Sequence, residues 1–465
     1  MGCALAMLSA CTVGPQYQRP NIAVPAAFKE QQGWKQAEPR DAAPRQPWWE
    51  VYGDAQLNAL IEQVAIANEN VHIAAAQYRA ARALVDSARA AKLPTVTANA
   101  SITRGQSAPV SAAAPIFTTA TTDRIALGAT WEADLWGRIS STVEVNETAA
   151  QASAADLQSV LLSAQSLLAQ SYLQLRVNDA QSGLLARTIK EYERALEITS
   201  NRYRAGVASR LDVTQAETQL RSTQAQAIDL ELQRAQLEHA IAVLLGKTPA
   251  EFSIAKVDAL PLIPETVVAI PSELLEHRPD IAGAERRVAS ANAQIGVAQA
   301  AYYPSLILTA NGGFQGSSFS HLLTAPHRFW SIGPALVETL FDGGARSAQK
   351  EQALANYDKS VASYRATVLS AFQQVEDDLA ALRILDRESE TQHAAVTAAQ
   401  ESVRVATNQY DAGLVSYLNV VTAQTTALST ERSALDLASR RLAASVALLR
   451  DLGGNWSTQM VVGHY

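Results

Sequence analysis

The chain has 465 residues and a formal net charge of −7, and this length exceeds what one hydrophobic core usually organises. The acidic balance excludes nucleic acid as an expected partner, because such a partner requires a basic surface. No run of 18 apolar residues occurs, and even 155–175 is interrupted by Asp156 and several glutamines. The sequence therefore excludes a transmembrane helix, and it could cross a membrane only as a closed β-barrel.

Two cysteines, Cys3 and Cys11, both lie at the very start of the chain, which excludes disulfides and cysteine metal sites in the folded body. Cys11 follows Leu8-Ser9-Ala10, an apolar and small-residue run typical of a lipoprotein signal that is cleaved before a lipidated cysteine. We therefore expect 1–10 to be a signal remnant and Cys11 to carry lipid; a chance cysteine in an apolar leader is the alternative. A signal peptide normally has a basic start and about 15–30 residues, so a truncated start is expected.

An internal repeat organises the rest of the chain. Tyr203 to Thr218 matches Tyr410 to Thr425 at a constant offset of 207, and Ala88 to Ala100 matches Ala298 to Ala310. The two halves are therefore a duplicated unit. The expected domains are an N-terminal segment, a first repeat, a linker, a second repeat and a C-terminal tail, with the boundaries 11–54, 55–246, 247–271, 272–453 and 454–465.

Each repeat begins with a helix and later contains a long uninterrupted helical stretch. The stretches 138–205 and 345–412 contain no proline, and Gly183 is the only glycine in them, so each would extend about 100 Å as a helix. Gly206 and Gly413 end them as natural C-terminal caps, and shorter helices over 207–245 and 414–452 follow. A seven-residue spacing in the last helix indicates supercoiled packing; it is kept by Val421, Leu428, Leu435, Leu442 and Leu449.

Each repeat also holds an expected strand pair, at 94–136 and at 304–341. Residues Ile125 to Trp136 alternate apolar and polar side chains, as in strands with opposite faces in opposite solvents. We expect Glu132 and Asp134 to face a watery lumen and Trp131 to face lipid. Two alternatives stay open: a pair of half-buried hairpins on a soluble domain, or carboxylates that lie just below the membrane.

Four strands per chain are too few to close a transmembrane barrel. Two chains would make a plugged barrel, and three would make a twelve-stranded barrel with room for a passage. Transport therefore favours three or more copies, although this argument does not by itself fix three.

Three motifs resemble the TolC-like outer-membrane efflux factor family, in its NodT-type lipoprotein branch. They are the start Cys11 to Pro15, the pair Trp48-Trp49, and the segment Leu275 to Ile281, which reads LEHRPDI. The resemblance implies a mainly α protein with a membrane β part: a trimeric α-helical barrel continuous with a twelve-stranded β-barrel, internally duplicated. It also implies an equatorial collar from 11–54 and 247–271.

The same resemblance implies an outer-membrane exit duct of a tripartite efflux pump, which passively conducts drugs or other small molecules. The implied partners are two further copies of the chain, a periplasmic adaptor, an inner-membrane RND-type pump and outer-membrane lipid. It places the chain in the outer membrane, lipid-anchored at Cys11 and extending into the periplasm. No catalytic, cofactor or metal constellation is recognisable, so we do not expect an enzyme. The alternative is a periplasmic coiled-coil adaptor or a structural envelope protein.

The turns that join the long and short helices are the expected functional sites. In the resembling family such helix tips contact the periplasmic adaptor. The resemblance therefore implies that Gly206 and Val207, together with Gly413 and Leu414, dock the adaptor; a plain turn without docking is the alternative.

Some multidrug relatives close the duct with a Leu, an Asp four residues later and an Arg three residues beyond that. The matching positions here are Leu418, Thr422 and Thr425. We therefore expect a gate built on rings of Leu418, with Leu211 and Asp212 from the first repeat, rather than on ion pairs. Ordinary heptad packing of Leu418 is the alternative.

Overall fold

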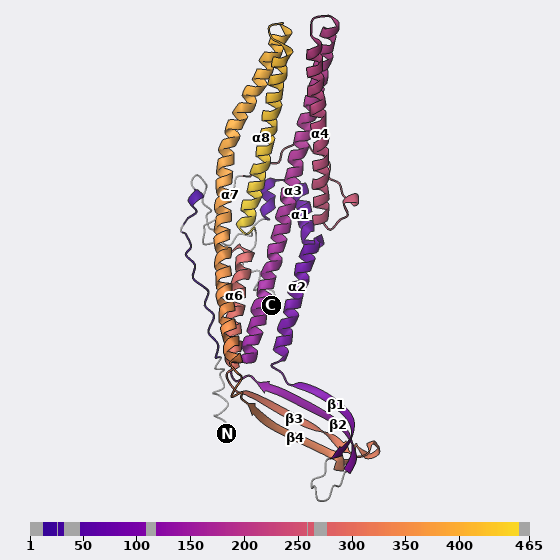
Figure 1. The fold of residues 1–465 in the computed structure, drawn as a ribbon, viewed down its shortest axis with the longest axis vertical. Helices are drawn as coiled ribbons and strands as arrows, with labels where there is room; N and C mark the ends of the chain where they lie inside the picture. The colour runs from indigo at the N-terminus through magenta and orange to yellow at the C-terminus, as the bar shows by residue number, and fades with distance from the viewer. Residues whose placement is uncertain are drawn as a thin grey trace. The chain divides into compact units, whose positions relative to one another are not determined.

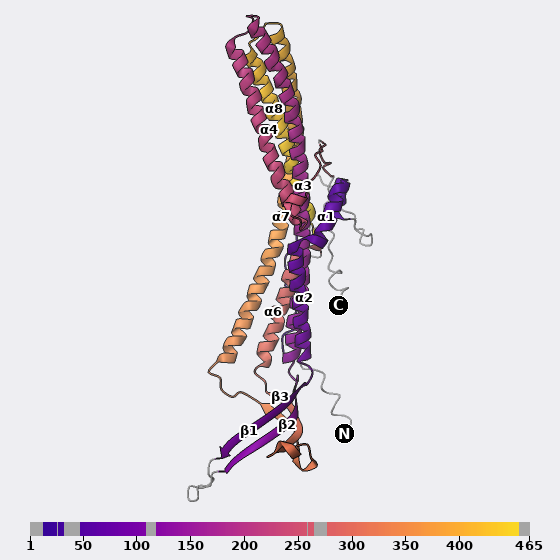
Figure 2. The same ribbon diagram turned by 90° about the vertical axis from the view of Figure 1, so that its right-hand side faces the viewer.

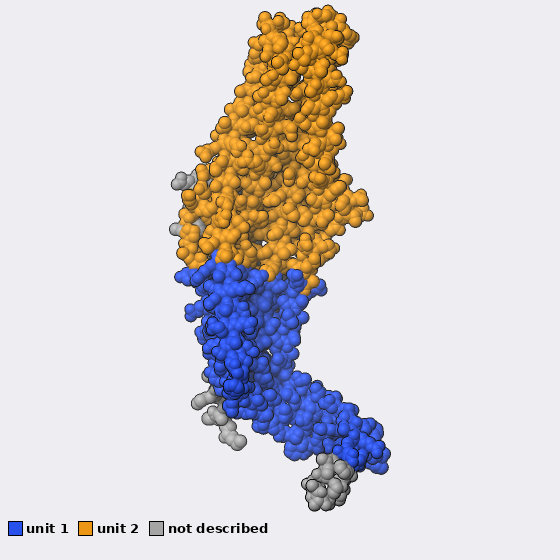
Figure 3. Space-filling model, in the orientation of Figure 1, with its two compact units in different colours: residues 1–21, 77–153, 283–365 blue, residues 22–76, 154–282, 366–465 orange. Residues whose placement is uncertain are grey.

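A computed structural model of the chain describes residues 13–25, 27–31, 47–107, 118–257, 259–264 and 277–454. These residues form two compact units, coloured in Figure 3. Unit 1 comprises 1–21, 77–153 and 283–365, and unit 2 comprises 22–76, 154–282 and 366–465. Each unit takes residues from both sequence repeats, so the compact units do not follow the repeat boundaries.

The first repeat begins with two helices, α1 (Ala55–Ala67) and α2 (Glu69–Ala90), where the sequence suggested one. Asn68 causes the break. Its side-chain oxygen accepts hydrogen bonds from the backbone N–H groups of Asn70 and Val71, at 3.0 and 3.2 Å, as a helix N-cap does. Its amide donates to the carbonyl of Leu244 at 2.8 Å. The side chain thus ends one helix, starts the next, and ties both to a distant helix.

The long helices are α3 (Arg138–Arg204) and α7 (Ala345–Asp411), of 67 residues each, within one residue of the expected ranges. Each is followed by a 35-residue helix, α4 (Arg210–Leu244) or α8 (Tyr417–Asp451). The second repeat also contains α6 (Pro279–Ala300). Figures 1 and 2 show that the α3–α4 and α7–α8 hairpins turn at the same end of unit 2. Among the described residues we find no helix that combines the length and the apolar composition of a transmembrane span.

The four strands form one antiparallel sheet in the order β1-β2-β3-β4. Their bounds are Thr95–Ser107, Thr118–Ala133, Ser305–Gly316 and Arg328–Val337. The two inner strands, β2 and β3, come from different repeats, so pairing between the repeats holds the sheet together. Two strands end earlier than the sequence suggested: β4 ends at Val337, which pairs with Ser305, the first residue of β3, and β2 ends at Ala133, which pairs with Leu306. β2 thus stops one residue before the start of β3, where the Asp134 carboxylate accepts N–H groups at the start of α3 instead.

The sheet is amphipathic. Residues that pair directly across antiparallel strands share a face, and the register places Val96, Ala129, Ala310 and Ile332 on one face. Eight large apolar side chains on this face are exposed: Val96, Ile102, Leu127, Trp131, Leu308, Trp330, Ile332 and Leu336. The opposite face is mainly polar and contains Thr97, Asn99, Thr130, Glu132, Thr309, Asn311 and Ser331.

The largest hydrophobic core lies within unit 2. It joins α1 to the middle of α3 and the end of α4, and its centre is fully buried at Leu57, Ile61, Leu168 and Tyr172. This core fixes the base of the helical hairpins, whose turns carry the expected docking residues.

Candidate functional site

The two hairpin turns have the same backbone construction. Gly206 and Gly413 adopt φ values of +75° and +76°, which glycine reaches without the steric penalty of a Cβ atom. The N–H of Val207 donates to the carbonyl of Arg202 at 2.8 Å, and the N–H of Leu414 donates to that of Gln409 at 2.9 Å. These bonds satisfy carbonyls that would otherwise be left open at each helix end, in the Schellman arrangement. The duplicated sequence therefore encodes one turn twice.

Both turns present apolar side chains to solvent. Val207 is 68% exposed and Leu414 is 76% exposed. A Cβ atom built on Gly206 or Gly413 meets no other atom within 4 Å. The turns are thus open surfaces, and only the positive φ values restrict these two positions to glycine within the chain itself.

The helices that follow the turns are capped differently. Ser209 and Asp212 form a reciprocal capping box at the start of α4: the Asp212 N–H donates to Ser209 Oγ at 3.2 Å, and the Ser209 N–H donates to Asp212 Oδ2 at 2.9 Å. At the start of α8, Ser416 makes no such side-chain bond. Asp212, expected at the gate, is therefore engaged in capping its own helix.

Leu211 and Leu418 occupy equivalent places, as the second residue of α4 and of α8. Their side chains are 63% and 53% exposed within the single chain. Neither is buried by the packing of its own hairpin, so both are free to contact other copies. The gate assignment stays a prediction.

Arg202 joins the two hairpins near their turns. Its guanidinium carbon lies 4.4 Å from the centre of the Tyr410 ring, and its Nη1 atom is 3.8 Å from the Asp411 carboxylate. The Tyr410 ring in turn lies 5.3 Å from that of Tyr417. Burial, followed by the neighbouring Tyr410, raises the pKa of Tyr417 to about 12, so its hydroxyl stays protonated. No sequence pattern indicated this cluster, although Tyr410 belongs to the internal repeat.

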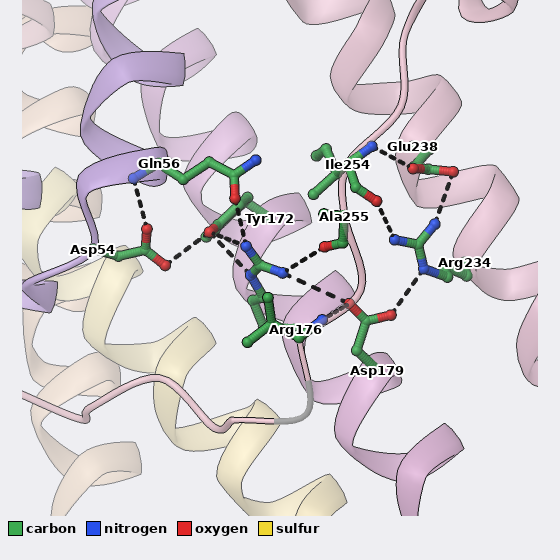
Figure 4. A network of polar contacts seen from close by, with 10 residues as sticks. Asp54, Gln56, Tyr172, Arg176, Asp179, Arg234, Glu238, Ile254 and Ala255 are labelled. Carbon is green, nitrogen blue, oxygen red and sulfur yellow. Dashed lines mark hydrogen bonds and ion pairs between the residues drawn. The ribbon is translucent and has the colours of Figure 1, made fainter. Parts of the chain in front are cut away.

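A larger polar network, which no sequence pattern indicated, lies buried at the base of the α3–α4 hairpin (Figure 4). The Asp179 side chain is fully buried and accepts from Arg234 Nε at 2.8 Å. Arg176 donates to Tyr172 at 2.9 Å and to the carbonyl of Ala255 at 3.0 Å. Arg234 also donates to the carbonyl of Ile254 at 2.5 Å. The network therefore fastens the segment after α4 onto α3.

Tyr172 extends the same network to α1. Its hydroxyl donates to Asp54 Oδ2 at 2.7 Å, and Asp54 caps α1 by accepting from the N–H groups of Gln56 and Leu57. Burial and the Asp54 acceptor raise the pKa of Tyr172, so this hydroxyl remains a donor. Spacing within any single helix could not reveal contacts between residues so far apart in the chain.

The structure places Glu132 and Trp131 on opposite faces of β2, as the alternation predicts, with Trp131 on the apolar face. Glu132 forms a two-pronged ion pair with Arg138, at 3.1 and 2.6 Å. Asp134 lies just past the end of β2, and its carboxylate accepts the N–H groups of Ile139 and Ser140 at the start of α3, at 2.9 and 2.7 Å. Strand alternation therefore does not govern the direction of Asp134, because the residue has left the sheet. A lumenal position for either carboxylate stays a prediction.

Cys11 lies outside the described residues, so its lipidation stays a prediction. Among the residues that the structure does describe, no group of three or more His, Cys, Asp or Glu side chains is placed to hold a metal ion.

Comparisons with known proteins agree with this architecture. The family model described as "Outer membrane efflux protein" matches residues 60–247 and 270–454. The chain is 31% identical to the probable efflux pump outer membrane protein TtgC of Pseudomonas putida, over 97% of this chain and 94% of that protein. It is 30% identical to the outer membrane protein OprJ of Pseudomonas aeruginosa, over 97% and 94% of the two chains.

Among solved structures, the outer-membrane channel OprN superposes with a TM-score of 0.90 at 30% identity, over 96% of this chain and 99% of that one. The match therefore includes the hairpins and the sheet together, and nearly all of each chain takes part in it. With its duplicated hairpins and its four-stranded amphipathic sheet, the chain belongs to the outer membrane efflux protein family.

Proposed function

We propose that three copies of this chain assemble into the outer-membrane exit duct of a tripartite efflux pump, which passively conducts small molecules to the exterior. The observation that carries this function is the exposed apolar face of the sheet, where Trp330 and Ile332 are 80% and 76% exposed. A contiguous apolar surface of this kind marks an interaction surface or a membrane contact. The opposite, mainly polar face suits a water-filled passage.

The edges of the sheet support assembly from several copies. Within the described sheet β1 and β4 each pair on one side only, which leaves backbone N–H and C=O groups open along both edges. In lipid such groups must find partners, since no water is available to them. Pairing of β4 with β1 of the next copy satisfies both edges, and three copies supply the twelve strands of a barrel with a passage.

The hairpin turns are the proposed contact for a periplasmic adaptor, which links the duct to an inner-membrane RND-type pump. Gly206, Val207, Gly413 and Leu414 form an open, partly apolar surface at the end of unit 2. Bare glycine backbone allows a partner to approach closely. Three copies present six such turns, which suits a hexameric adaptor.

The proposed gate lies four residues beyond Val207 and Leu414 of the docking surface. Exposed Leu211 and Leu418 from three copies supply two sets of three apolar side chains, which can close on one another by burying apolar area. Asp212 stays with Ser209 in the capping box, so we assign it to shaping the gate rather than to an ion-pair latch.

Lipid on Cys11 is proposed as an auxiliary anchor. The segment that follows it is fixed to the helices of unit 1: the carbonyl of Pro15 accepts from Asn292 at 2.9 Å, and Arg19 donates to the hydroxyl of Tyr364 at 3.2 Å. These contacts place the start of the described chain against α6 and α7. An acyl chain there would add to the membrane affinity of the sheet.

Neighbouring residues on opposite faces of β4 provide a matched test of the function. Ile332→Arg should prevent insertion into the outer membrane, because an arginine on the lipid face costs about 2–4 kcal/mol near the bilayer midplane. Ser331→Arg, on the polar face, should insert normally and form conducting trimers in planar bilayers. Fractionation of the envelope and the mass of the detergent-solubilised protein give the readout. Equal insertion of the two variants would contradict the assignment of the faces.

A further inference from the structure

The duplication places the same joint at the end of each short helix. In the first joint, defined by Ala67, Asn68, Leu244 and Gly246, a Cβ atom on Gly246 would lie 2.2 Å from the carbonyl oxygen of Ala67. In the second joint, defined by His277, Arg278, Asp451 and Gly453, a Cβ atom on Gly453 would lie 1.8 Å from the carbonyl oxygen of His277. In both, only glycine permits such close backbone contact.

A side chain closes each joint in the same way but with different chemistry. The neutral amide of Asn68 donates to the carbonyl of Leu244 at 2.8 Å. The charged guanidinium of Arg278 donates to the carbonyl of Asp451 at 3.1 Å. Leu244 and Asp451 are the last residues of α4 and α8. The first joint is therefore neutral, whereas the second has become ionic.

The second joint contains more carboxyl groups than its two arginines pair directly. Arg278 binds the Asp280 carboxylate at 3.1 and 2.7 Å, and Arg450 binds the Asp451 carboxylate at 2.8 Å through two nitrogens. Neither of these two arginine pairs includes Asp378 of α7. Its Oδ2 atom is buried and accepts no hydrogen bond from a donor among the described residues. In the first repeat the equivalent position holds Ser171, which cannot ionise near neutral pH.

The second joint brings polar and charged groups from several helices together. A cavity of about 250 Å³ at the joint is lined by groups from four elements and the residue before α6: Ser159 and Ser163 of α3, Arg278, Asp280 of α6, Gln374 of α7, and Arg450 and Asp451 of α8. Asp377 precedes Asp378 and is exposed, and His277 precedes Arg278. The carboxyl groups of Asp378 and Asp451 are neighbours. Arg450 binds the Asp451 carboxylate, and Arg278 lies 3.8 Å from it, whereas Asp378 Oδ2 receives no hydrogen bond. A proton on one of the two carboxyl groups supplies the missing donor.

We propose that Asp378 and Asp451 share one proton, and that the second joint is a proton-binding site that holds the end of α8 against α6 and α7. Loss of this proton places two negative charges side by side, one on the buried Asp451 and one on the half-buried Asp378, and weakens the joint. The first joint, which contains no ionisable group at the matching positions, keeps its strength. Alkaline pH therefore loosens one end of the second hairpin and leaves its counterpart in the first unchanged.

The direction of titration agrees with this geometry. Burial, and then the charge and hydrogen bond of Asp451, raise the pKa of Asp378 to about 8, while Arg450 acts in the opposite direction. The pKa of an aspartate in the unfolded chain is about 3.9. The folded state therefore binds more protons between these two values, so stability falls as pH rises from about 4 to about 8 and then levels off.

Infrared difference spectroscopy on the full-length, detergent-solubilised protein tests the proton directly. The wild type should show the carbonyl stretch of a protonated carboxylic acid at about pH 6 and lose it at about pH 10, with a midpoint near the raised pKa. Asp378→Asn should remove this band, whereas Asp377→Asn, a change at the exposed neighbour, should retain it. Absence of the band in the wild type, or its survival in Asp378→Asn, overturns the proposal.

Amide hydrogen exchange shows which helix end becomes less stable when the proton is lost. After correction for the intrinsic rate, protection in the last turn of α8 should fall roughly tenfold or more between about pH 6 and about pH 10. Protection in the last turn of α4 should stay constant. Asp378→Ser, which copies Ser171 of the first repeat, should make the two helix ends behave alike. Equal pH dependence of α4 and α8 in the wild type would contradict a proton-controlled second joint.

Discussion

Two ion pairs, one in each repeat, occupy equivalent positions and differ mainly in burial. Asp179 pairs with Arg234 at 2.8 Å, and its side chain is 0% exposed. The residues 207 positions later, Asp386 and Arg441, pair at 2.5 Å, but the Asp386 side chain is 62% exposed. The segment after α4 covers the first pair, since the Val257 N–H also donates to Asp179 at 3.3 Å. Duplication thus preserved the pair, and the surrounding structure changed its energetic role.

The same contrast applies to other equivalent positions of the two repeats. A residue of one repeat therefore has a natural control at the equivalent position of the other.

The largest effect is expected at the hairpin turns. A bulky substitution at both Gly206 and Gly413, such as Gly→Trp, should abolish efflux while leaving trimer assembly and membrane insertion intact. The added side chains enter open space but obstruct the partner's approach. Drug accumulation in cells that contain the cognate pump and adaptor measures the outcome.

Gly53 provides the control for backbone strain at these turns. It has a φ of +63° and no atom within 4 Å of an added Cβ, so Gly53→Trp imposes a similar conformational cost away from the turns. That variant should retain efflux. An active pump with tryptophan at both turns would refute docking, and comparison of the single variants shows whether the two turns contribute equally.

Stability should separate the two ion pairs. Asp179→Ala leaves Arg176 and Arg234 buried without their shared carboxylate and should cost about 3–5 kcal/mol. Asp386→Ala breaks a largely exposed pair and should cost about 0–1 kcal/mol. Guanidinium unfolding followed by circular dichroism measures both. Similar losses for the two variants would show that burial does not distinguish the pairs.

The gate prediction compares Leu418 with Leu211. Leu418→Ala should raise the open fraction of purified trimers in planar bilayers, because it removes apolar contact area from the closed state. Leu211→Ala should have a smaller effect, since we place the main closure at Leu418. High salt should change the wild type little, because salt screens ion pairs rather than apolar contacts. A large opening by salt alone would argue for an ionic latch instead.

The smallest effect is expected at the helix starts after the turns. Asp212→Ala removes one half of the capping box of α4 and should cost about 0.3–1 kcal/mol. Asn419→Ala, at the equivalent position of α8, should change stability less, because Ser416 forms no side-chain cap there. Thermal unfolding of the two variants compares them directly. A greater loss for Asn419→Ala would mean that the second turn has a cap absent from the described contacts.

By itself the sequence determined the features that arise from local rules or from duplication. Long stretches without proline and with almost no glycine predicted α3 and α7 to within one residue, because helix formation depends on neighbouring residues. Gly206 and Gly413 identified both turns, since a positive φ strongly favours glycine. Alternation along β2 predicted opposite faces for Trp131 and Glu132, because successive strand residues point in opposite directions. The family motifs led to the function.

Only the tertiary structure decided features that depend on contacts between distant segments. The end of β4 is set by where β3 begins, whereas β2 ends before Asp134, whose carboxylate caps α3. The burial of Asp179, when compared with that of Asp386, is set by the segment after α4. The closeness of Asp378 to Asp451 joins two helices from different parts of the second repeat. A sequence pattern shows the spacing of residues along one helix or strand. The burial of a side chain, its bonding partners and its pKa depend on the residues that other elements place next to it.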